Sequence, residues 1–272
     1  ITLDGGGLQL LADLNIGEAT ATDGRAVVVG SGGGVLDTNS HNSTISKTIS
    51  GAGTFTKQGD GTLTLTANNA GLTGGVTVDK GTLSISNDNN LGSPSARLTL
   101  KDGTTLETTQ EVSLLSRELT LSSGNVTLQQ HTNNVILGQK VTGSGHLVKE
   151  GSGVLTLDGV NDFSGGVNVN AGQVTVSKDS SLGSGTATFA TGTQLNTSAN
   201  VQLANQISLN GTTAIDTAAA TKATLTGVVG DVLGSPTLGK LVKQGDGALA
   251  LDTANTYSGG TNVNKGKVVV NK

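Results

Sequence analysis

One block of sequence occurs three times in this chain of 272 residues and constrains its fold more than any other feature. Each copy runs from an apolar-x-Lys stretch through a Gly-x-Gly corner into an apolar-x-apolar stretch. The lysines of the three copies, Lys57, Lys149 and Lys243, are 92 and then 94 residues apart. Because a long, fixed period is the signature of stacked repeat architectures, this spacing predicts a solenoid.

Each copy continues in the same way after the Gly-x-Gly corner. A glycine pair precedes a short alternating run, and a further glycine precedes another. The pairs are Gly74-Gly75, Gly165-Gly166 and Gly259-Gly260. We predict one unit over 1–272, divided into super-repeats at approximately 1–48 (partial), 49–140, 141–236 and 237–272 (partial). We also expect a fragment without terminal caps, cut from a longer protein.

Almost every apolar run alternates with polar residues, as in Leu63-Thr64-Leu65 and Val76-Thr77-Val78. A period of two indicates strands with one buried and one solvated face. Threonine, serine and asparagine occupy the outward positions, and the branched threonine suits an extended backbone. The stretch from Val112 to Leu119 is the exception, because its spacing allows one loose helical turn.

The composition separates a β-helix from a sandwich or barrel. Three Phe, one Tyr and no Trp cannot anchor an ordinary globular core. Small aliphatic residues instead suit the like-on-like ladders of a coiled parallel sheet. Three strands and three corners need roughly 20–25 residues per coil, so the period holds four coils and the chain about twelve. We predict an all-β, right-handed parallel β-helix, with the handedness taken from parallel crossovers.

Charge and cysteine usage exclude several classes of protein and site. Only 13% of residues are charged and the net charge is −4, which has the wrong sign for a nucleic-acid partner. The absence of cysteine excludes disulfides and zinc-thiolate sites. No apolar run approaches the roughly 18 residues of a membrane-spanning helix.

The repeated pattern resembles a known family. The third copy fits best, with Asn255-Thr-Tyr257-Ser-Gly259-Gly-Thr261, whereas the second has Phe163 for the tyrosine and the first has Leu72. This pattern is similar to the passenger-associated transport repeat of autotransporters, the type V secreted proteins of Gram-negative bacteria. The strong motifs cover a minor part of the chain, and the remainder follows from the period.

The resemblance implies a β-helical adhesin at the cell surface, anchored at the outer membrane or released. It implies a signal peptide and a C-terminal translocator barrel in the full-length protein, and it accounts for the absence of cysteine. It also implies partners, either like passengers on neighbouring cells or a host matrix protein or glycan. Clumping, biofilm formation and virulence are the expected consequences.

No catalytic, cofactor or metal motif is present, so we predict no enzyme, no cofactor and no metal site. The ligand-binding residues are unknown at this stage. The histidines are His41, His131 and His146. We interpret His146 as a surface residue at an outward strand position and His41 as a loop residue.

Two sets of carboxylates have a functional and a structural interpretation. Asp60 and Asp246 lie in Gln-Gly-Asp-Gly corners, where calcium binding competes with an ordinary turn. Asp158 and Asp162 resemble a glycosidase pair or, again, turn residues. In both sets we favour the turn. The glycosylation sequons fit chance in a chain this rich in Asn and Thr, and they begin at Asn42, Asn125, Asn196 and Asn210.

Three functions remain open, and an adhesive and self-associating stalk is our first hypothesis. A pure spacer for a functional region outside the fragment is the alternative, and a β-helical polysaccharide-degrading enzyme is third. We interpret the three repeated lysines as solvated residues that prevent off-register pairing. The segments that break the period are the candidate ligand sites, namely 37–48, 107–140 and 214–236.

Overall fold

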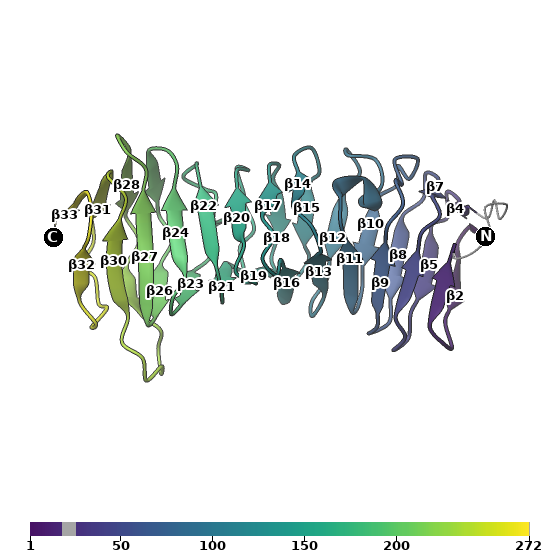
Figure 1. Cartoon of the computed structure of the whole chain (residues 1–272), viewed down its shortest axis with the longest axis horizontal. Helices are drawn as coiled ribbons and strands as arrows, with labels where there is room; N and C mark the ends of the chain where they lie inside the picture. Colours follow the sequence, from purple (N-terminus) through teal and green to yellow (C-terminus); the bar gives the residue numbers. More distant parts are fainter. Residues whose placement is uncertain (18–25, 272) are drawn as a thin grey trace.

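Nearly every alternating run forms a short parallel strand in the computed structural model, and the strands stack into a solenoid of about twelve turns (Figure 1). The structure describes residues 1–17 and 26–271. The portion of the predicted partial repeat 1–48 that falls on 18–25 lies outside the described residues. The prediction of an all-β parallel β-helix of about twelve coils is confirmed.

Each turn passes over three faces, and on each face a strand pairs with the strands of adjacent turns. The first face carries β1 (Thr2–Leu3), β4 (Val27–Val29), β7 (Ile49–Ser50), β14 (Val112–Leu114), β17 (Val135–Leu137), β20 (Val154–Leu157), β22 (Gln173–Val176), β24 (Gln194–Thr197), β27 (Thr212–Thr217), β30 (Lys240–Gln244) and β32 (Thr261–Val263).

The second face carries β2 (Gly6–Gln9), β5 (Gly34–Asp37), β8 (Phe55–Gln58), β10 (Val76–Val78), β12 (Leu98–Leu100), β15 (Leu119–Leu121), β18 (Val141–Gly143), β25 (Val201–Leu203), β28 (Lys222–Leu225), β31 (Ala248–Leu251) and β33 (Lys267–Val270). The third carries β3 (Leu14–Ile16), β6 (Ser43–Ile45), β9 (Thr62–Leu65), β11 (Thr82–Ile85), β13 (Thr105–Thr108), β16 (Asn125–Gln129), β19 (His146–Glu150), β21 (Val167–Val169), β23 (Ala187–Ala190), β26 (Ile207–Asn210) and β29 (Val229–Asp231).

The interior is a column of small aliphatic side chains stacked like on like. Leu63, Leu83 and Leu106 are register partners on successive turns, and each is at most 1% exposed. Burying a leucine side chain contributes about 1.5–3 kcal/mol, so the repeated ladder supplies the main stabilising force. Phe55 and Phe163 are also buried in this column.

The helical content differs from the sequence-based expectation. The predicted loose turn over Val112–Leu119 is wrong, because β14 ends at Leu114 and β15 begins at Leu119. The alternation of buried Val112 and Leu114 follows a strand, not a helix. The one helix among the described residues is the 3₁₀ helix η1 (Asp88–Leu91), which the sequence analysis did not predict.

The period of the strong repeat corresponds to four and one third turns. Its lysine-bearing strand is β8 on the second face, β19 on the third and β30 on the first. The prediction of four whole coils per period is therefore wrong by one strand. As a result, successive copies of the repeat are turned by one face around the rod.

Each copy also interrupts one face of the solenoid. The first face has no strand between β7 and β14, and the second has none between β18 and β25. The predicted glycine corners lie beside these interruptions. Gly75 and Gly166 have φ of 86° and 94°, conformations that favour glycine, and a Cβ at Gly74 would lie 2.3 Å from the carbonyl oxygen of Ala52.

Candidate functional site

The three repeated lysines are fully buried, so their interpretation as solvated residues is wrong. Lys57 Nζ donates hydrogen bonds to Thr38 Oγ1 at 3.2 Å and to the carbonyl oxygens of Gln58, Gly59 and Lys80 at 3.3, 2.7 and 2.9 Å. Each lysine therefore ties its own Gly-x-Gly corner to the corner of the next turn.

The other two lysines repeat this arrangement with fewer or longer contacts. Lys149 Nζ donates to the carbonyl oxygens of Gly151 at 2.7 Å and Ala171 at 3.0 Å. Lys243 Nζ donates to three carbonyl oxygens, including that of Gly245 at 2.7 Å. Burial lowers the pKa of Lys57 and of Lys149 to about 8, and it lowers the pKa of Lys243 as well.

Where the first and second repeats interrupt a face, a buried asparagine replaces the missing strand. Asn69 Oδ1 accepts from the backbone N–H of Ile49 at 2.7 Å, and its Nδ2 donates to the carbonyl oxygen of Asn90 at 2.7 Å. Asn161 makes the equivalent bonds to Val141 and Ser181 at 2.8 and 2.6 Å. One side chain thereby joins three successive turns and satisfies backbone groups that a ladder would otherwise pair.

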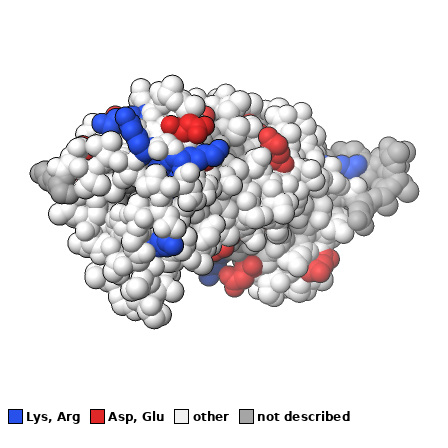
Figure 2. Space-filling model, turned by 60° about the vertical axis from the view of Figure 1, so that its left-hand side comes forward, with Lys and Arg blue, Asp and Glu red and all other residues white. Residues whose placement is uncertain are grey.

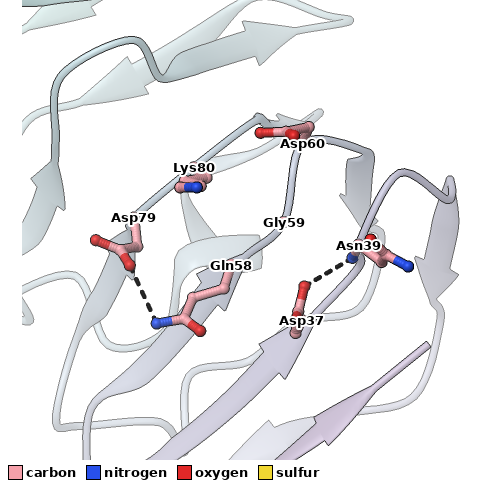
Figure 3. A pocket seen from close by; sticks show the side chains of 7 residues that line it. All are labelled: Asp37, Asn39, Gln58, Gly59, Asp60, Asp79 and Lys80. Atoms are coloured by element: carbon pink, nitrogen blue, oxygen red, sulfur yellow. Dashed lines mark hydrogen bonds between the residues drawn. The ribbon is translucent and has the colours of Figure 1, made fainter.

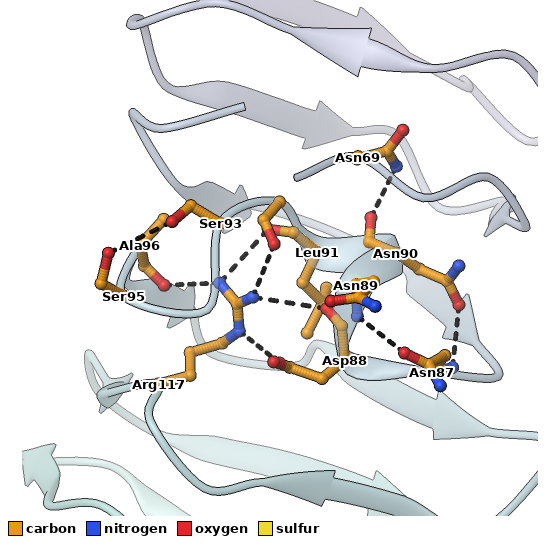
Figure 4. Close-up of polar contacts among 11 residues, drawn as sticks. Asn69, Asn87, Asp88, Asn89, Asn90, Leu91, Ser93, Ser95, Ala96 and Arg117 are labelled. Atoms are coloured by element: carbon orange, nitrogen blue, oxygen red, sulfur yellow. Dashed lines mark hydrogen bonds and ion pairs between the residues drawn. The ribbon is translucent and has the colours of Figure 1, made fainter. Parts of the chain in front are cut away.

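The segment that follows the first repeat is held from the next turn by Arg117 (Figure 4). Its guanidinium is fully buried and donates to Asp88 Oδ1 at 2.8 Å. It also donates to four carbonyl oxygens, including those of Gly92 at 3.1 Å and Ala96 at 2.5 Å. Asn205 has the same role after the second repeat, because its Nδ2 donates to the carbonyl oxygens of Gly183 and Gly185.

The candidate histidines are separate from one another. His41 Nδ1 lies 3.5 Å from Asp13 Oδ1, and His131 Nε2 lies 2.9 Å from Glu107 Oε1. His146 is exposed on the outward side of β19, where the sequence analysis expected it. Ser84, the register partner of Glu107 on the preceding turn, hydrogen-bonds the same carboxylate, so Glu107 lies between the serine and His131.

The candidate carboxylates lie at corners. Asp60 and Asp246 are exposed beside the buried lysines. Asp158 accepts a hydrogen bond from Ser177, whereas Asp162 pairs with Lys140, so the two carboxylates have different partners. Within residues 1–17 and 26–271, no group of three or more His, Asp or Glu side chains is placed to hold a metal ion.

The three period-breaking segments continue the solenoid, with short strands joined by turns. Segment 37–48 contains β6, and segment 107–140 contains β14 to β17. In segment 214–236, only the connection after β29 departs from the rod, and Leu233 at its tip is 99% exposed. These segments therefore stay candidate ligand sites only because parts of them are exposed to solvent.

An open groove of about 380 Å³ lies at the corner of the first repeat and has polar walls (Figure 3). Asp37 Oδ1 accepts from the backbone N–H of Asn39 at 2.7 Å, and Gln58 Nε2 donates to Asp79 Oδ2 at 3.0 Å. The backbone hydrogen bond from Asn39 and the bond from Gln9 hold the pKa of Asp37 below its usual value. These carboxylates are thus engaged by their own neighbours.

The outward surface of the second face carries a row of threonines on five successive strands. Their register follows the pairing of β8, β10, β12, β15 and β18, and the row comprises Thr56, Thr77, Thr99, Thr120 and Thr142. All five are partly exposed. Charged residues are sparse and gather in small groups of both signs (Figure 2). The rod therefore presents a hydroxyl-rich surface with few charges.

None of the helices in the part of the chain described here has the length and apolar character needed to cross a bilayer. A family model described as "Passenger-associated-transport-repeat" matches residues 55–85, 147–176 and 241–270. The "Adhesin BmaC autotransporter" of Brucella suis biovar 1 (strain 1330) is 31% identical over 280 residues, which cover 92% of this chain and 8% of that relative. The chain thus spans a small part of the relative's length. No solved structure matches it.

The family matches coincide with the structural units found above. Each begins in the lysine-bearing strand, includes the asparagine at the interruption and ends with the strand that pairs with the one after the Gly-x-Gly corner. The family resemblance inferred from sequence is confirmed: the chain is built on three passenger-associated transport repeats and is similar over most of its length to part of an autotransporter.

Proposed function

We propose that this segment is an adhesive stalk that contacts like passengers on neighbouring cells or a host matrix protein or glycan. The five-threonine row supports this proposal most directly, because it offers many equivalent hydroxyl and methyl groups at strand spacing, about 4.8 Å. The adhesin name of the relative adds support. A location at the bacterial surface, attached through a translocator domain elsewhere in the full-length protein, belongs to the same proposal.

Each contact on such a surface is weak, since an exposed hydroxyl exchanges water for a partner at a net gain of roughly 1 kcal/mol. Display of many rods on one cell raises the effective concentration of the later contacts once the first has formed. The proposed function therefore depends on a straight, repeated surface, and it requires no deep pocket.

We also propose that the segment has no enzymatic role. The carboxylates that resembled a glycosidase pair, Asp158 and Asp162, are bound to Ser177 and Lys140. The aromatic side chains that could stack on a sugar are scarce, and Phe55 and Phe163 are buried. The division into super-repeats near residues 49, 141 and 237 stays a proposal, to be tested by the cooperativity of truncated chains.

The test is surface display of the chain on bacteria that do not clump. Settling rate and attachment to immobilised matrix proteins and glycans are measured against the same display system without the chain. Faster settling, or attachment above the control, is expected. Neither effect, with display confirmed by surface labelling, would leave the alternative of a spacer whose partner site lies elsewhere in the protein.

A further inference from the structure

The connection between β29 and β30 contains a leucine whose environment differs from that of two leucines in the same tripeptide. Leu-Gly-Ser occurs at 91–93, 182–184 and 233–235. Leu91 and Leu182 are fully buried at the junctions after the first and second repeats, whereas Leu233 is 99% exposed. The third leucine therefore lies outside the core of the rod.

This connection is also much longer than its counterpart on the preceding turn. Gly211 alone joins β26 to β27, whereas residues 232–239 join β29 to β30 and project from the rod below β27 in the view of Figure 1. The end of the projection is held, because the N–H of Gly239 donates to Asp231 Oδ1 at 2.6 Å. The tip is therefore open to solvent while its base stays fixed to the rod.

The peptide bond between Leu233 and Gly234 lies at this tip and has few contacts. Within the described residues, no backbone hydrogen bond involves Leu233 or Gly234, and a Cβ at Gly234 would meet nothing within 4 Å. A turn bond closes over them, from the N–H of Ser235 to the carbonyl oxygen of Val232 at 3.1 Å. Exposed loop tips that open locally at low cost are the preferred places of proteolytic cleavage.

We propose that the Leu233–Gly234 bond is a processing site for a protease with an apolar S1 pocket, which the leucine side chain fills. The hydroxyl of one water molecule joins the carbonyl carbon of Leu233, the proton of that water joins the nitrogen of Gly234, and the C–N bond breaks. The products ionise to a carboxylate and an ammonium group. Residues 232–239 carry no other charge and the tip is exposed, so both new charges are solvated.

Other exposed leucines lack one of these features. Leu11 and Leu115 are exposed, yet each lies in a connection of four residues between consecutive strands. Such a short connection cannot enter a protease cleft in an extended form unless the flanking strands unpair. Leu238 is exposed in the same long connection as Leu233, but the N–H of the next residue, Gly239, is hydrogen-bonded to a carboxylate. The Leu233–Gly234 bond thus combines exposure with room to extend.

The two products should stay joined after the cut. β30 and β31 of the second product pair with β27 and β28 of the first, at five and four positions. Asp231 of the first product also binds Ser258 of the second, whose Oγ donates to Asp231 Oδ2 at 2.6 Å. Hydrolysis therefore replaces a covalent connection with noncovalent pairing that unfolding or mechanical load can separate. The stalk becomes severable directly before its third repeat, whichever partner it binds.

Limited digestion with chymotrypsin tests the site, because this protease prefers Tyr and Phe to Leu. The phenylalanines are buried, so sequence preference alone directs the first cut to Tyr257, which is partly exposed. In the native chain we expect the first cut after Leu233 instead, with products 1–233 and 234–272 identified by mass spectrometry. These products should elute together from gel filtration in buffer and separate in urea. A synthetic peptide of residues 228–262 contains both bonds without the fold and should be cut after Tyr257 first.

Two variants separate the leucine from its loop. Leu233→Asp should slow the first cut at least about tenfold, whereas Leu238→Asp makes the same change in the same connection and should leave the rate within about twofold. Thermal unfolding of each variant checks that the fold is retained.

A first cut at any other bond of the native chain, or equal rates for Leu233→Asp and the wild-type chain, would overturn the processing site. Products that separate in buffer would overturn the joined rod. None of these readouts uses clumping or attachment, so the outcome is independent of the adhesive function proposed above.

Discussion

Two junctions of the rod, the segments that follow the first and the second repeat, leave backbone carbonyl oxygens inside the rod. Different side chains bind these oxygens at the two junctions. After the first repeat, the segment around Gly92 leaves carbonyl oxygens inside the rod, and the guanidinium of Arg117 binds them. After the second repeat, the carboxamide of Asn205 binds the oxygens around Gly183. Both side chains come from the turn that follows.

The difference between the junctions follows from the length of the chain at each. Seven positions separate Leu91 from Leu98, whereas five separate Leu182 from Ala187. The 3₁₀ helix η1 lies directly before the longer first junction and brings Asp88 inward, so this junction is held by a long, charged donor. The shorter second junction leaves two close oxygens that one amide can satisfy. The comparison shows that the backbone oxygens are hydrogen-bonded at both junctions, whereas the type of residue that donates the bonds differs.

The largest effect is expected from breaking the first junction. Arg117→Met removes the buried guanidinium and leaves Asp88 without its cation, which should lower the free energy of unfolding by about 3–5 kcal/mol. Urea denaturation measures this change. Arg97→Met, an exposed arginine one turn earlier, is the control and should cost about 0.5 kcal/mol or less. A loss below 1 kcal/mol for Arg117→Met would contradict the assigned role.

Asn161, on the preceding turn, also holds the second junction. Its removal is expected to have the next largest effect on the free energy of unfolding. Asn161→Ala leaves the N–H of Val141 and the carbonyl oxygen of Ser181 buried without partners. At about 1–2 kcal/mol for each of the two unpaired neutral groups, the loss should be about 2–4 kcal/mol. Asn168→Ala, on the outward side of β21, is the matched control. Equal losses for the two alanine variants would show that the bridge does not stabilise the junction.

The first and second repeats both contain a buried lysine at the Gly-x-Gly corner. These lysines predict that the free energy of unfolding depends on pH. The folded pKa of Lys57 and of Lys149 is about 8, against 10.5 for a solvated lysine. Between these values the unfolded chain binds more protons than the folded one, so the free energy of unfolding rises with pH in this window. The rise should not exceed about 3 kcal/mol per lysine.

Denaturation at pH 7.5, 9 and 10.5 measures this rise. The variant Lys57→Met/Lys149→Met should be less stable at neutral pH, because carbonyl oxygens lose their donors, and its stability should change less across the window. A wild-type stability that falls steadily from pH 8 would refute the effect of burial on these lysines.

The smallest effect is expected from Asn205→Ala, and it completes the comparison. The variant loses two neutral hydrogen bonds, to Gly183 and Gly185, without leaving a charge unpaired. We expect a loss of about 1–2 kcal/mol, clearly below that of Arg117→Met. Gln202→Ala, at the exposed central position of β25 between buried Val201 and Leu203, should change little. Equal effects of Asn205→Ala and Arg117→Met would remove the distinction between the junctions.

The strands, their parallel stacking and the glycine corners were predictable from sequence. Alternation over residues such as Leu63 and Leu65 reports burial directly, because a period of two allows one buried face only. The long period identified the repeat, but its length could not distinguish four turns from four and one third. That distinction depends on which face each strand joins, and neighbours 20 or more residues away decide it.

The buried lysines were misjudged although their strand carried the signal. Phe55 and Lys57 lie two residues apart, so alternation places both inside, yet the usual exposure of lysine favoured the opposite interpretation. The repeat marks the position of Asn161, because an asparagine precedes the glycine pair in every copy, but neither the role of Asn161 nor that of Arg117 could be read from it. Their partners are backbone oxygens 20 or more residues away, and a polar side chain with such partners looks like any surface residue in the sequence.

Amide hydrogen exchange over the two junctions tests most directly whether each is held by its own side chain from the following turn. Exchange is measured for residues 91–96 and 182–185 in the wild-type chain, in Arg117→Met and in Asn205→Ala. We expect Arg117→Met to accelerate exchange at the first junction only and Asn205→Ala at the second only. Equal acceleration at both junctions in either variant, or none in both, would contradict this account of the rod.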